Sequence, residues 1–215
     1  MVNLVANTKQ YDLSPARIRR RQGQRTVFEV LARSIASQQL SGLVARRILQ
    51  RLVDAHGGSF PTPEQITAAT PQMLRATGFS FAKIAALKDL AAHSLDGRLP
   101  ADAALAELED EAIIECCTAV RGIGRWTVQM LLMFHFGRPD VLPVDDYGVR
   151  NGFRVAYGLK GLPQPRALAG FGERWQPYRS AAAWHLWRAV EMHQQGVLPP
   201  RAGRAPRVAI VKPKP

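Results

Sequence analysis

Apolar residues recur at the spacing of an α-helix along nearly the whole chain, and this periodicity constrains the fold more than any other feature. Val27, Phe28, Leu31 and Ile35 share one face of a helix predicted over residues 25–36. The one convincing strand-like alternation is the short segment 207–211. The periodicity therefore predicts an all-α protein.

Helix boundaries are marked by proline and acidic residues. Pro63 and Pro71 each open a predicted helix, at a position where the missing N–H group is harmless. Four acidic residues gather in the first turn of the helix predicted over residues 107–120, as the helix dipole favours. About nine or ten short helices are predicted, and the others cover residues 40–56, 63–69, 71–77, 83–94, 125–136, 145–157 and 177–195.

The chain is strongly basic, with a formal net charge of +12. Residues 197–215 supply five of these twelve charges, which leaves seven for the rest of the chain. A basic surface suits DNA or RNA, because each phosphate that it neutralises releases condensed counterions. The five prolines of residues 197–215 predict an extended, solvated tail. We therefore expect a nucleic-acid partner for the folded part of the chain.

Several classes of protein are excluded by what the sequence lacks. No apolar run approaches the roughly 20 residues of a membrane span, and the first ten residues lack the apolar stretch of a secretory signal. We therefore expect no membrane partner and a cytoplasmic, nucleoid-associated location. Cys116 and Cys117 face different directions on a predicted helix, so they cannot form half of a CxxC metal site. We expect two free thiols and no catalytic metal.

Two glycines separated by one residue, Gly122 and Gly124, lie between two predicted helices. Glycine permits positive φ and lets the backbone approach a ligand closely. The free N–H groups at the start of the following helix, together with its dipole, can bind an anion such as a DNA phosphate. Arg121, Arg125 and the hydroxyl of Thr127 favour this function, although any tight connection between helices can use the same turn.

Two adjacent aspartates, Asp145 and Asp146, follow Pro143 and open the helix predicted over residues 145–157. Asp146 lies 146 − 124 = 22 residues after Gly124. Aspartate is a preferred N-cap residue. One of the pair can therefore cap the helix while its neighbour faces a cleft.

The hairpin, the helix that contains Trp126 and Thr127, and the segment Pro143–Tyr147 together resemble the signature of the helix–hairpin–helix (HhH-GPD) superfamily of DNA glycosylases. Within it, the chain is most similar to the 3-methyladenine DNA glycosylase II branch, which acts on alkylated bases. The similarity extends from about residue 25 to residue 196 and also includes residues 33–41, 78–83, 173–180 and 185–187.

The resemblance implies an all-α fold of two helical lobes with a cleft between them. Residues 25–137 would form the first lobe, with the helix–hairpin–helix at 109–136. Residues 138–196 would form the second lobe, which carries the aspartates. A basic N-terminal segment, residues 1–24, would pack with the second lobe, and residues 197–215 would form the basic, proline-rich tail.

Two features depart from the family pattern. Arg121 stands where the family usually has a proline, which we expect to loosen the hairpin while it adds a cation. The chain also begins too close to Gln38 and Gln39 to carry the β-rich N-terminal domain of the larger bacterial members. We expect this to leave a more open site.

The resemblance assigns the catalytic role to Asp146. Cleavage of the N-glycosidic bond develops positive charge on the sugar, and a carboxylate beside C1′ stabilises that charge and can orient or deprotonate a water. Asp145 is then expected to cap the helix or to lie behind Asp146 without contacting the substrate. A base must be flipped out of the duplex to be reached, and the gap must be filled. The resemblance places Gln39 as this wedge, with Ser80 or Phe81 in a second loop.

An alkylated base carries a positive charge, which an aromatic pocket can select. The resemblance places Trp126, Tyr147 and Trp187 at pocket-facing positions, although each tryptophan alone would more often be a core residue. Met130 stands where a relative carries an aromatic side chain, so we expect altered selectivity. Trp126 also occupies the position of the lysine with which strand-cleaving members form a Schiff base. The resemblance therefore implies a monofunctional enzyme.

The implied contacts with DNA lie in the two wedge loops and the hairpin. They are Gln39, Ser80, Phe81, Arg121, Gly122, Gly124, Arg125 and Thr127. The family hairpin often holds a structural Na⁺ or K⁺ through backbone carbonyls, here those of Thr118, Val120 and Ile123. No catalytic cofactor is expected.

The expected function is therefore hydrolysis of the N-glycosidic bond of alkylated bases in double-stranded DNA, by a monomer. The substrates would be of the 3-methyladenine type and could include 7-methylguanine and 1-methyladenine. Two alternatives stay open. A non-catalytic helix–hairpin–helix module would bind DNA but need no Asp146, and a bifunctional glycosylase/lyase would form a covalent complex that borohydride traps.

Overall fold

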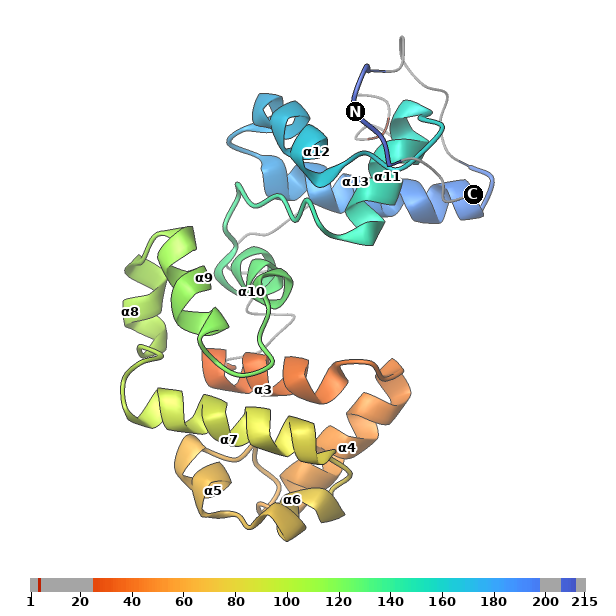
Figure 1. The fold of residues 1–215 in the computed structure, drawn as a ribbon. Coiled ribbons are helices and arrows are strands. Elements are labelled where there is room, and N and C mark those ends of the chain that lie inside the picture. The colour runs from red at the N-terminus through yellow and green to blue at the C-terminus, as the bar shows by residue number, and fades with distance from the viewer. Residues whose placement is uncertain (1–3, 5–24, 198–205, 212–215) are drawn as a thin grey trace. The chain divides into compact units, whose positions relative to one another are not determined.

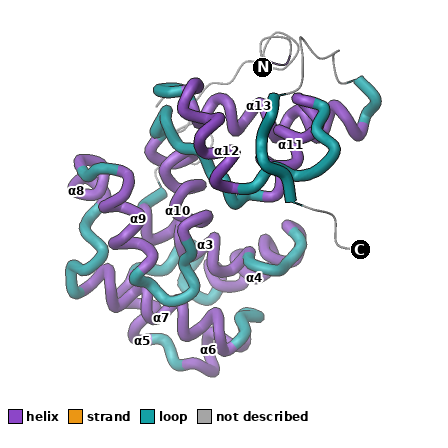
Figure 2. The backbone as a smooth tube through the Cα atoms, turned by 45° about the horizontal axis from the view of Figure 1, so that its top comes forward, coloured by secondary structure: helices purple, strands orange, loops and turns teal. Residues whose placement is uncertain are grey.

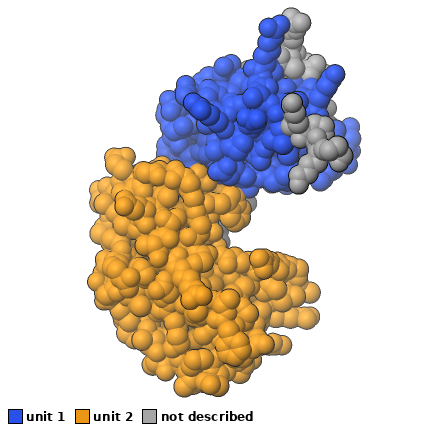
Figure 3. All heavy atoms as spheres, in the orientation of Figure 1, with its two compact units in different colours: residues 1–18, 132–215 blue, residues 19–131 orange. Residues whose placement is uncertain are grey.

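The computed structural model describes residue 4, residues 25–197 and residues 206–211 of the chain (Figure 1). Helices joined by loops make up these residues, and they contain no strand (Figure 2). The all-α prediction is therefore confirmed. The chain forms two compact units (Figure 3). We call residues 19–131 the hairpin unit, and residues 1–18 with 132–215 the aspartate unit.

The hairpin unit is built around α7 (Phe81–Leu95), which packs against α3 (Val27–Ser37) and α5 (Pro63–Ala68) (Figure 1). Leu87 and Leu90 of α7 are fully buried. Burial of such a side chain stabilises the fold by about 1.5–3 kcal/mol. The remaining helices of this unit are α4 (Gly42–Asp54), α6 (Pro71–Ala76), α8 (Asp102–Glu107), α9 (Asp110–Thr118) and α10 (Arg125–Leu131).

Side-chain caps start five of these helices. The oxygen of a serine or threonine accepts a hydrogen bond from a backbone N–H in the first turn, and removal of such a cap typically costs about 1 kcal/mol. The capping residues are Thr26, Ser41, Thr62, Thr70 and Ser80.

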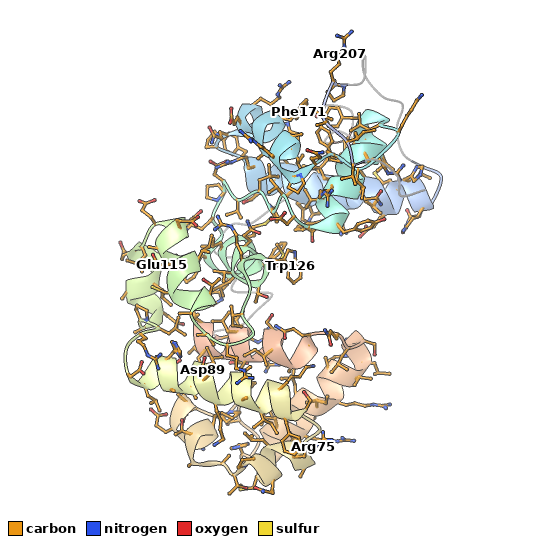
Figure 4. All side chains as sticks on the ribbon, viewed as in Figure 1. Arg75, Asp89, Glu115, Trp126, Phe171 and Arg207 are labelled. Atoms are coloured by element: carbon orange, nitrogen blue, oxygen red, sulfur yellow. The ribbon has the colours of Figure 1, made fainter. Side chains whose placement is uncertain are left out.

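The aspartate unit contains α11 (Tyr147–Tyr157), α12 (Pro165–Gly172) and α13 (Arg179–Gln194). Helices α11 and α13 cross at very short range, because a Cβ atom at Gly152 would lie 2.0 Å from the carbonyl oxygen of Leu186. Only glycine allows this approach. An aromatic cluster packs beside the crossing and includes Phe171, which Figure 4 labels; its members are Phe153, Tyr157, Phe171 and Trp175.

The predicted helices differ from the structure in several places. The predicted helix of residues 107–120 is the end of α8 followed by α9, and a break at Leu108 and Glu109 separates them. The predicted helix of residues 125–136 continues from α10 into a π-helical turn, Leu132–Phe136. The predictions did not include α8 before residue 107, helix α12 or the 3₁₀ turn Glu173–Trp175. The boundary between the units falls between residues 131 and 132, six residues before the predicted lobe boundary.

The described part of the tail is docked, so the prediction of a solvated arm is wrong for residues 206–211. The N–H of Gln164 donates to the carbonyl of Ala209 at 2.8 Å, and the N–H of Val211 donates to the carbonyl of Leu162 at 2.7 Å. Backbone pairing of this kind holds residues 209–211 against the loop that precedes α12. The other residues of the predicted tail after Val197, and those of the predicted N-terminal segment except Leu4, lie outside the described residues.

The two cysteines are free, as predicted. Cys117 is fully buried and Cys116 is half-buried. Burial, with a smaller contribution from Cys116, raises the pKa of the Cys117 thiol to about 12. Within the described residues, no group of three or more histidine, cysteine or carboxylate side chains could hold a metal ion. No helix in this part of the chain is long and apolar enough to cross a membrane.

Candidate active site

Asp146 stands at the start of α11 and is half-buried. Its Oδ1 accepts a hydrogen bond from the backbone N–H of Val149 at 2.6 Å and a second from Nε1 of Trp187 at 2.8 Å. One donor belongs to the first turn of α11 and the other to α13. The carboxylate is therefore fixed by two helices and lies at the positive end of the α11 dipole.

The structure corrects the assignment of the helix cap. We expected Asp145 to cap the helix or to lie behind Asp146, but Asp146 itself is the N-cap and Asp145 is exposed. The physical reason is a turn in which the N–H of Asp146 donates to the carbonyl of Pro143 at 3.1 Å. This turn delays the start of the helix to Tyr147. The residue predicted to be catalytic is thus also the residue that begins α11.

A glycine that sequence reasoning missed makes the Asp146–Trp187 contact possible. A Cβ atom at Gly148 would lie 2.7 Å from Cδ1 and 2.9 Å from Nε1 of Trp187, and 3.1 Å from Oδ1 of Asp146. Contacts below 3.0 Å essentially never occur, so any other residue at position 148 would displace the indole. A glycine in the first turn of an amphipathic helix was the only sequence signal.

The predicted pocket residues fall on both units. In the aspartate unit, Trp187 is half-buried and stacks against Phe134, with 6.0 Å between the ring centroids. Tyr147 is 67% exposed, next to Asp146 in the chain. In the hairpin unit, Trp126 is 49% exposed at the start of α10 (Figure 4), and Met130 is half-buried on the same helix. The structure thus brings Trp187 into contact with Asp146, while Tyr147 is the exposed neighbour of Asp146 in the chain.

The hairpin between α9 and α10 is braced by other helices of its unit. Gly122 has φ +78°, which only glycine adopts without strain, and Oδ2 of Asp89 on α7 accepts a hydrogen bond from the N–H of Arg121 at 2.7 Å (Figure 4). The Nε2 of Gln38 donates to the carbonyl of Gly122 at 2.8 Å. A proline at position 121 could not donate to Asp89. The arginine therefore gives the hairpin a tether, contrary to the loosening that we expected.

The predicted DNA contacts of the hairpin differ in their surroundings. Arg121 is exposed. Arg125 forms two hydrogen bonds with Glu111, at 2.6 and 2.7 Å, and these bonds lower the pKa of that carboxyl group. Thr127 is only 8% exposed, which weakens the prediction that its hydroxyl contacts DNA.

The two predicted wedge loops both belong to the hairpin unit. Gln39 is exposed and has φ +58°, the only positive φ of a non-glycine residue in the described part of the chain. In the second loop, Ser80 caps α7 and Phe81 is 69% exposed. The guanidinium of Arg75 lies 5.5 Å from the centre of the Phe81 ring (Figure 4). Both loops therefore present side chains to solvent, as a DNA-contacting surface requires.

Comparison with known proteins identifies the family of the chain. Residues 32–177 match the family described as HhH-GPD superfamily base excision DNA repair protein. DNA-3-methyladenine glycosylase 1 of Schizosaccharomyces pombe is 40% identical over 166 residues, which cover 77% of this chain and 73% of the relative. DNA-3-methyladenine glycosylase 2 of Escherichia coli is 31% identical, over 74% of this chain and 56% of the relative.

Two solved structures share the fold. The S. pombe 3-methyladenine DNA glycosylase in complex with abasic DNA aligns with a TM-score of 0.72 and 37% identity, over 87% of this chain and 89% of that one. A DNA-3-methyladenine glycosidase from Bacillus halodurans aligns with a TM-score of 0.75 and 32% identity, over 90% and 89%.

The match spans more than half of the chain, so the protein belongs to the HhH-GPD superfamily of base excision DNA repair proteins. Within that superfamily, it is similar to proteins named as DNA-3-methyladenine glycosylases. The family resemblance seen in the sequence, and the all-α fold that it implied, are therefore confirmed.

Proposed function

We propose that this chain is a monofunctional DNA glycosylase that hydrolyses the N-glycosidic bond of alkylated bases in double-stranded DNA, as a step of base excision repair. The proposed substrates are 3-methyladenine first, then 7-methylguanine and 1-methyladenine. The observation that carries this proposal is the carboxylate of Asp146, fixed by the Val149 N–H and the Trp187 indole. The names of similar proteins support the substrate class.

Asp146 would act on the sugar. As the bond to the base breaks, positive charge develops at C1′, and a carboxylate already held in place stabilises it without reorganisation at the moment of reaction. The same carboxylate can orient or deprotonate the attacking water. The water adds to C1′, its proton goes to the carboxylate or to solvent, and the base leaves with the bonding electron pair.

The alkylated base is a good leaving group, because its ring already carries a positive charge. The enzyme then needs little acid catalysis and gains selectivity from electron-rich rings that stack on a cationic base. Trp187 and Tyr147 lie beside Asp146 in the aspartate unit. We propose that they, with Trp126 and Met130 of the hairpin unit, contact the flipped base.

The surroundings of two lysines support a monofunctional enzyme. Nζ of Lys83 donates to the carbonyls of Ala36 and Gln38, both at 2.7 Å. Nζ of Lys88 donates to the carbonyls of Thr67 and Ala69, at 3.1 and 2.7 Å. Amines held in this way are poor candidates for Schiff-base formation, and Trp126 occupies the lysine position of strand-cleaving relatives.

We also propose that the protein acts as a monomer on DNA in the cytoplasm, in association with the nucleoid. The hairpin carbonyls of Thr118, Val120 and Ile123 would hold Na⁺ or K⁺ as a structural ion. The Val120 carbonyl already accepts a hydrogen bond from the N–H of Ile123 at 3.1 Å, and its second lone pair could serve the ion. A higher melting temperature in K⁺ than in choline, at equal ionic strength, would support the ion.

Base release tests the proposal. Wild type, Asp146→Asn and Asp145→Asn would be incubated with duplex oligonucleotides that each contain one of the three lesions, and the free base would be measured by chromatography. We expect Asp146→Asn to lower the single-turnover rate at least about 100-fold. The matched control Asp145→Asn changes an exposed neighbour and should stay within about twofold of wild type.

Two outcomes would contradict the proposal. If wild type releases no base above background although it binds the duplex, the chain is a DNA-binding module and not an enzyme. If sodium borohydride traps a covalent complex between the protein and damaged DNA, the enzyme is bifunctional. The relative rates on the three lesions establish the order of preference.

A further inference from the structure

The loop that carries Gln39 connects α3 to α4 and holds an unfavourable backbone conformation. Gln39 has φ +58°, in the left-handed region, which is unfavourable for a non-glycine residue. The conformation lies one residue beyond the C-cap of α3, Gln38. Strain of this kind persists only where the surrounding structure holds the backbone in place.

Lys83 supplies one restraint. Its ammonium group reaches from the first turn of α7 to the end of α3 and donates to the carbonyls of Ala36 and Gln38, both at 2.7 Å. The last carbonyls of a helix lack partners within it, and a cation is favourable there. Burial lowers the pKa of Lys83, since desolvation penalises the charged form. The lysine therefore acts on the backbone on the N-terminal side of Gln39.

Gln38 supplies the second restraint. Its backbone carbonyl accepts from Lys83, and its side-chain Nε2 donates to the carbonyl of Gly122 in the hairpin at 2.8 Å. Residue 38 thus contacts the second loop through its backbone and the hairpin through its side chain. All three segments lie in the hairpin unit. We call Lys83 and Gln38 the loop bracket.

We infer that the loop bracket is a positioning device for base flipping. Lys83 and Gln38 hold Gln39 in the strained conformation from which it enters the duplex, and they tie this loop to the second loop and the hairpin. The inference rests on the proposed function, in which Gln39 fills the gap left by the flipped nucleotide. Neither bracket residue needs to contact DNA.

Rigidity matters at this position because a flipped nucleotide loses its stacking and pairing, and contacts with the protein must offset that loss. If the loop were mobile, ordering it when DNA binds would also cost conformational entropy and weaken binding. A wedge that is already ordered avoids this cost. The bracket should therefore make the protein bind a duplex that has a gap for Gln39 to fill more tightly than an intact duplex.

A double-mutant cycle on DNA binding tests the inference. The probe is a fluorescein-labelled duplex with one tetrahydrofuran abasic site, measured by anisotropy beside the same duplex without the site. The quantity compared is the preference, the ratio of the two dissociation constants. We expect Gln39→Ala and Lys83→Met each to lower this preference about five- to tenfold, and the double variant to lower it no further.

Three further variants sharpen the test. Lys83→Arg keeps the charge and the donors, and we expect it to restore most of the preference. Lys88→Met removes an amine that also binds two carbonyls, those of Thr67 and Ala69, away from the loops, and should leave the preference unchanged. Gln38→Met should lower the preference about two- to threefold, since one neutral hydrogen bond is lost. Melting temperatures show whether Lys83→Met and Lys88→Met destabilise the fold to the same extent.

The inference is overturned if Lys83→Met leaves the preference unchanged, if the losses of Lys83→Met and Gln39→Ala multiply, or if Gln39→Ala has no effect. Because binding to an abasic duplex requires no chemistry, this outcome is independent of base release. A protein that shows the coupled loss but releases no base would retain the bracket and lose the proposed enzymatic function.

Discussion

The two units hold their functional groups by different means. In the aspartate unit, Asp146 is fixed where two helices approach so closely that Gly148 and Gly152 leave no room for a side chain. In the hairpin unit, the long polar side chains of Lys83 and Gln38 donate hydrogen bonds to backbone carbonyls of other segments. Close packing places a single carboxylate accurately, whereas polar tethers hold loops that must follow the surface of a duplex.

The largest effect is expected where backbone meets backbone. Gly152→Ala would place a methyl group against the Leu186 carbonyl, which cannot move without separating α11 from α13. We expect the free energy of unfolding to fall by about 3 kcal/mol, as measured by urea denaturation. The matched control is Gly170→Ala on α12, where a Cβ atom would have nothing within 4 Å. This substitution should raise the free energy of unfolding by about 0.5–1 kcal/mol. Equal effects at the two positions would refute this account of the crossing.

A change at Gly148 should separate chemistry from stability. In Gly148→Ala the methyl group meets the indole of Trp187, which is a side chain and can turn away. We expect the single-turnover rate of base release to fall about 10- to 100-fold, because the carboxylate loses a donor and its fixed position. Trp187→Phe removes the same donor, so the double variant should be little worse than either single variant. Multiplied losses would show that Gly148 acts in another way.

The tether of the hairpin should contribute less. Asp89→Ala removes the acceptor for the Arg121 N–H, a hydrogen bond worth about 1 kcal/mol. We expect the dissociation constant for undamaged duplex to rise about fivefold in an anisotropy titration, while the single-turnover rate at saturating enzyme changes little. Asp89→Asn keeps an acceptor oxygen and serves as the control. A loss of rate without a loss of affinity would contradict the idea that the hairpin unit serves DNA binding and the aspartate unit serves the reaction.

The smallest effect concerns the ion pair between Arg125 and Glu111, which is exposed on both sides. Glu111→Gln would remove the negative charge beside Arg125 and make this part of the surface more positive for a phosphate. We expect the affinity for DNA to rise about twofold. The slope of log affinity against log salt concentration should become steeper by up to about one. Titrations at three salt concentrations measure this slope. Unchanged affinity and slope would mean that Arg125 does not contact DNA.

Local sequence signals predicted most of the helices and the hairpin correctly. The 3.6-residue periodicity and the prolines gave α3 to α7 within a few residues, because each signal lies inside the element that it predicts. The periodicity does not predict α8 and α12, because these helices span only six and eight residues. The π-helical turn after α10 carries no local signal.

The candidate site was only partly readable from the sequence. The family resemblance implied the catalytic role of Asp146, but its role as the cap depends on a turn from Pro143 that moves the helix start. Gly148 acts on Trp187, which lies 39 positions later in the chain. Lys83 acts on Gln38, which lies 45 positions earlier. Such contacts exist only once the chain has folded, so no spacing in the sequence predicts them.

The cap at Asp146 has a consequence for how such an enzyme can change over time. One side chain both starts a helix and supplies the proposed catalytic charge, so selection cannot adjust the two traits separately. Replacement by asparagine would remove the charge and keep the helix start, because asparagine caps a helix as well as aspartate does. A descendant that loses catalysis through this change would keep a folded, DNA-binding body available for another use.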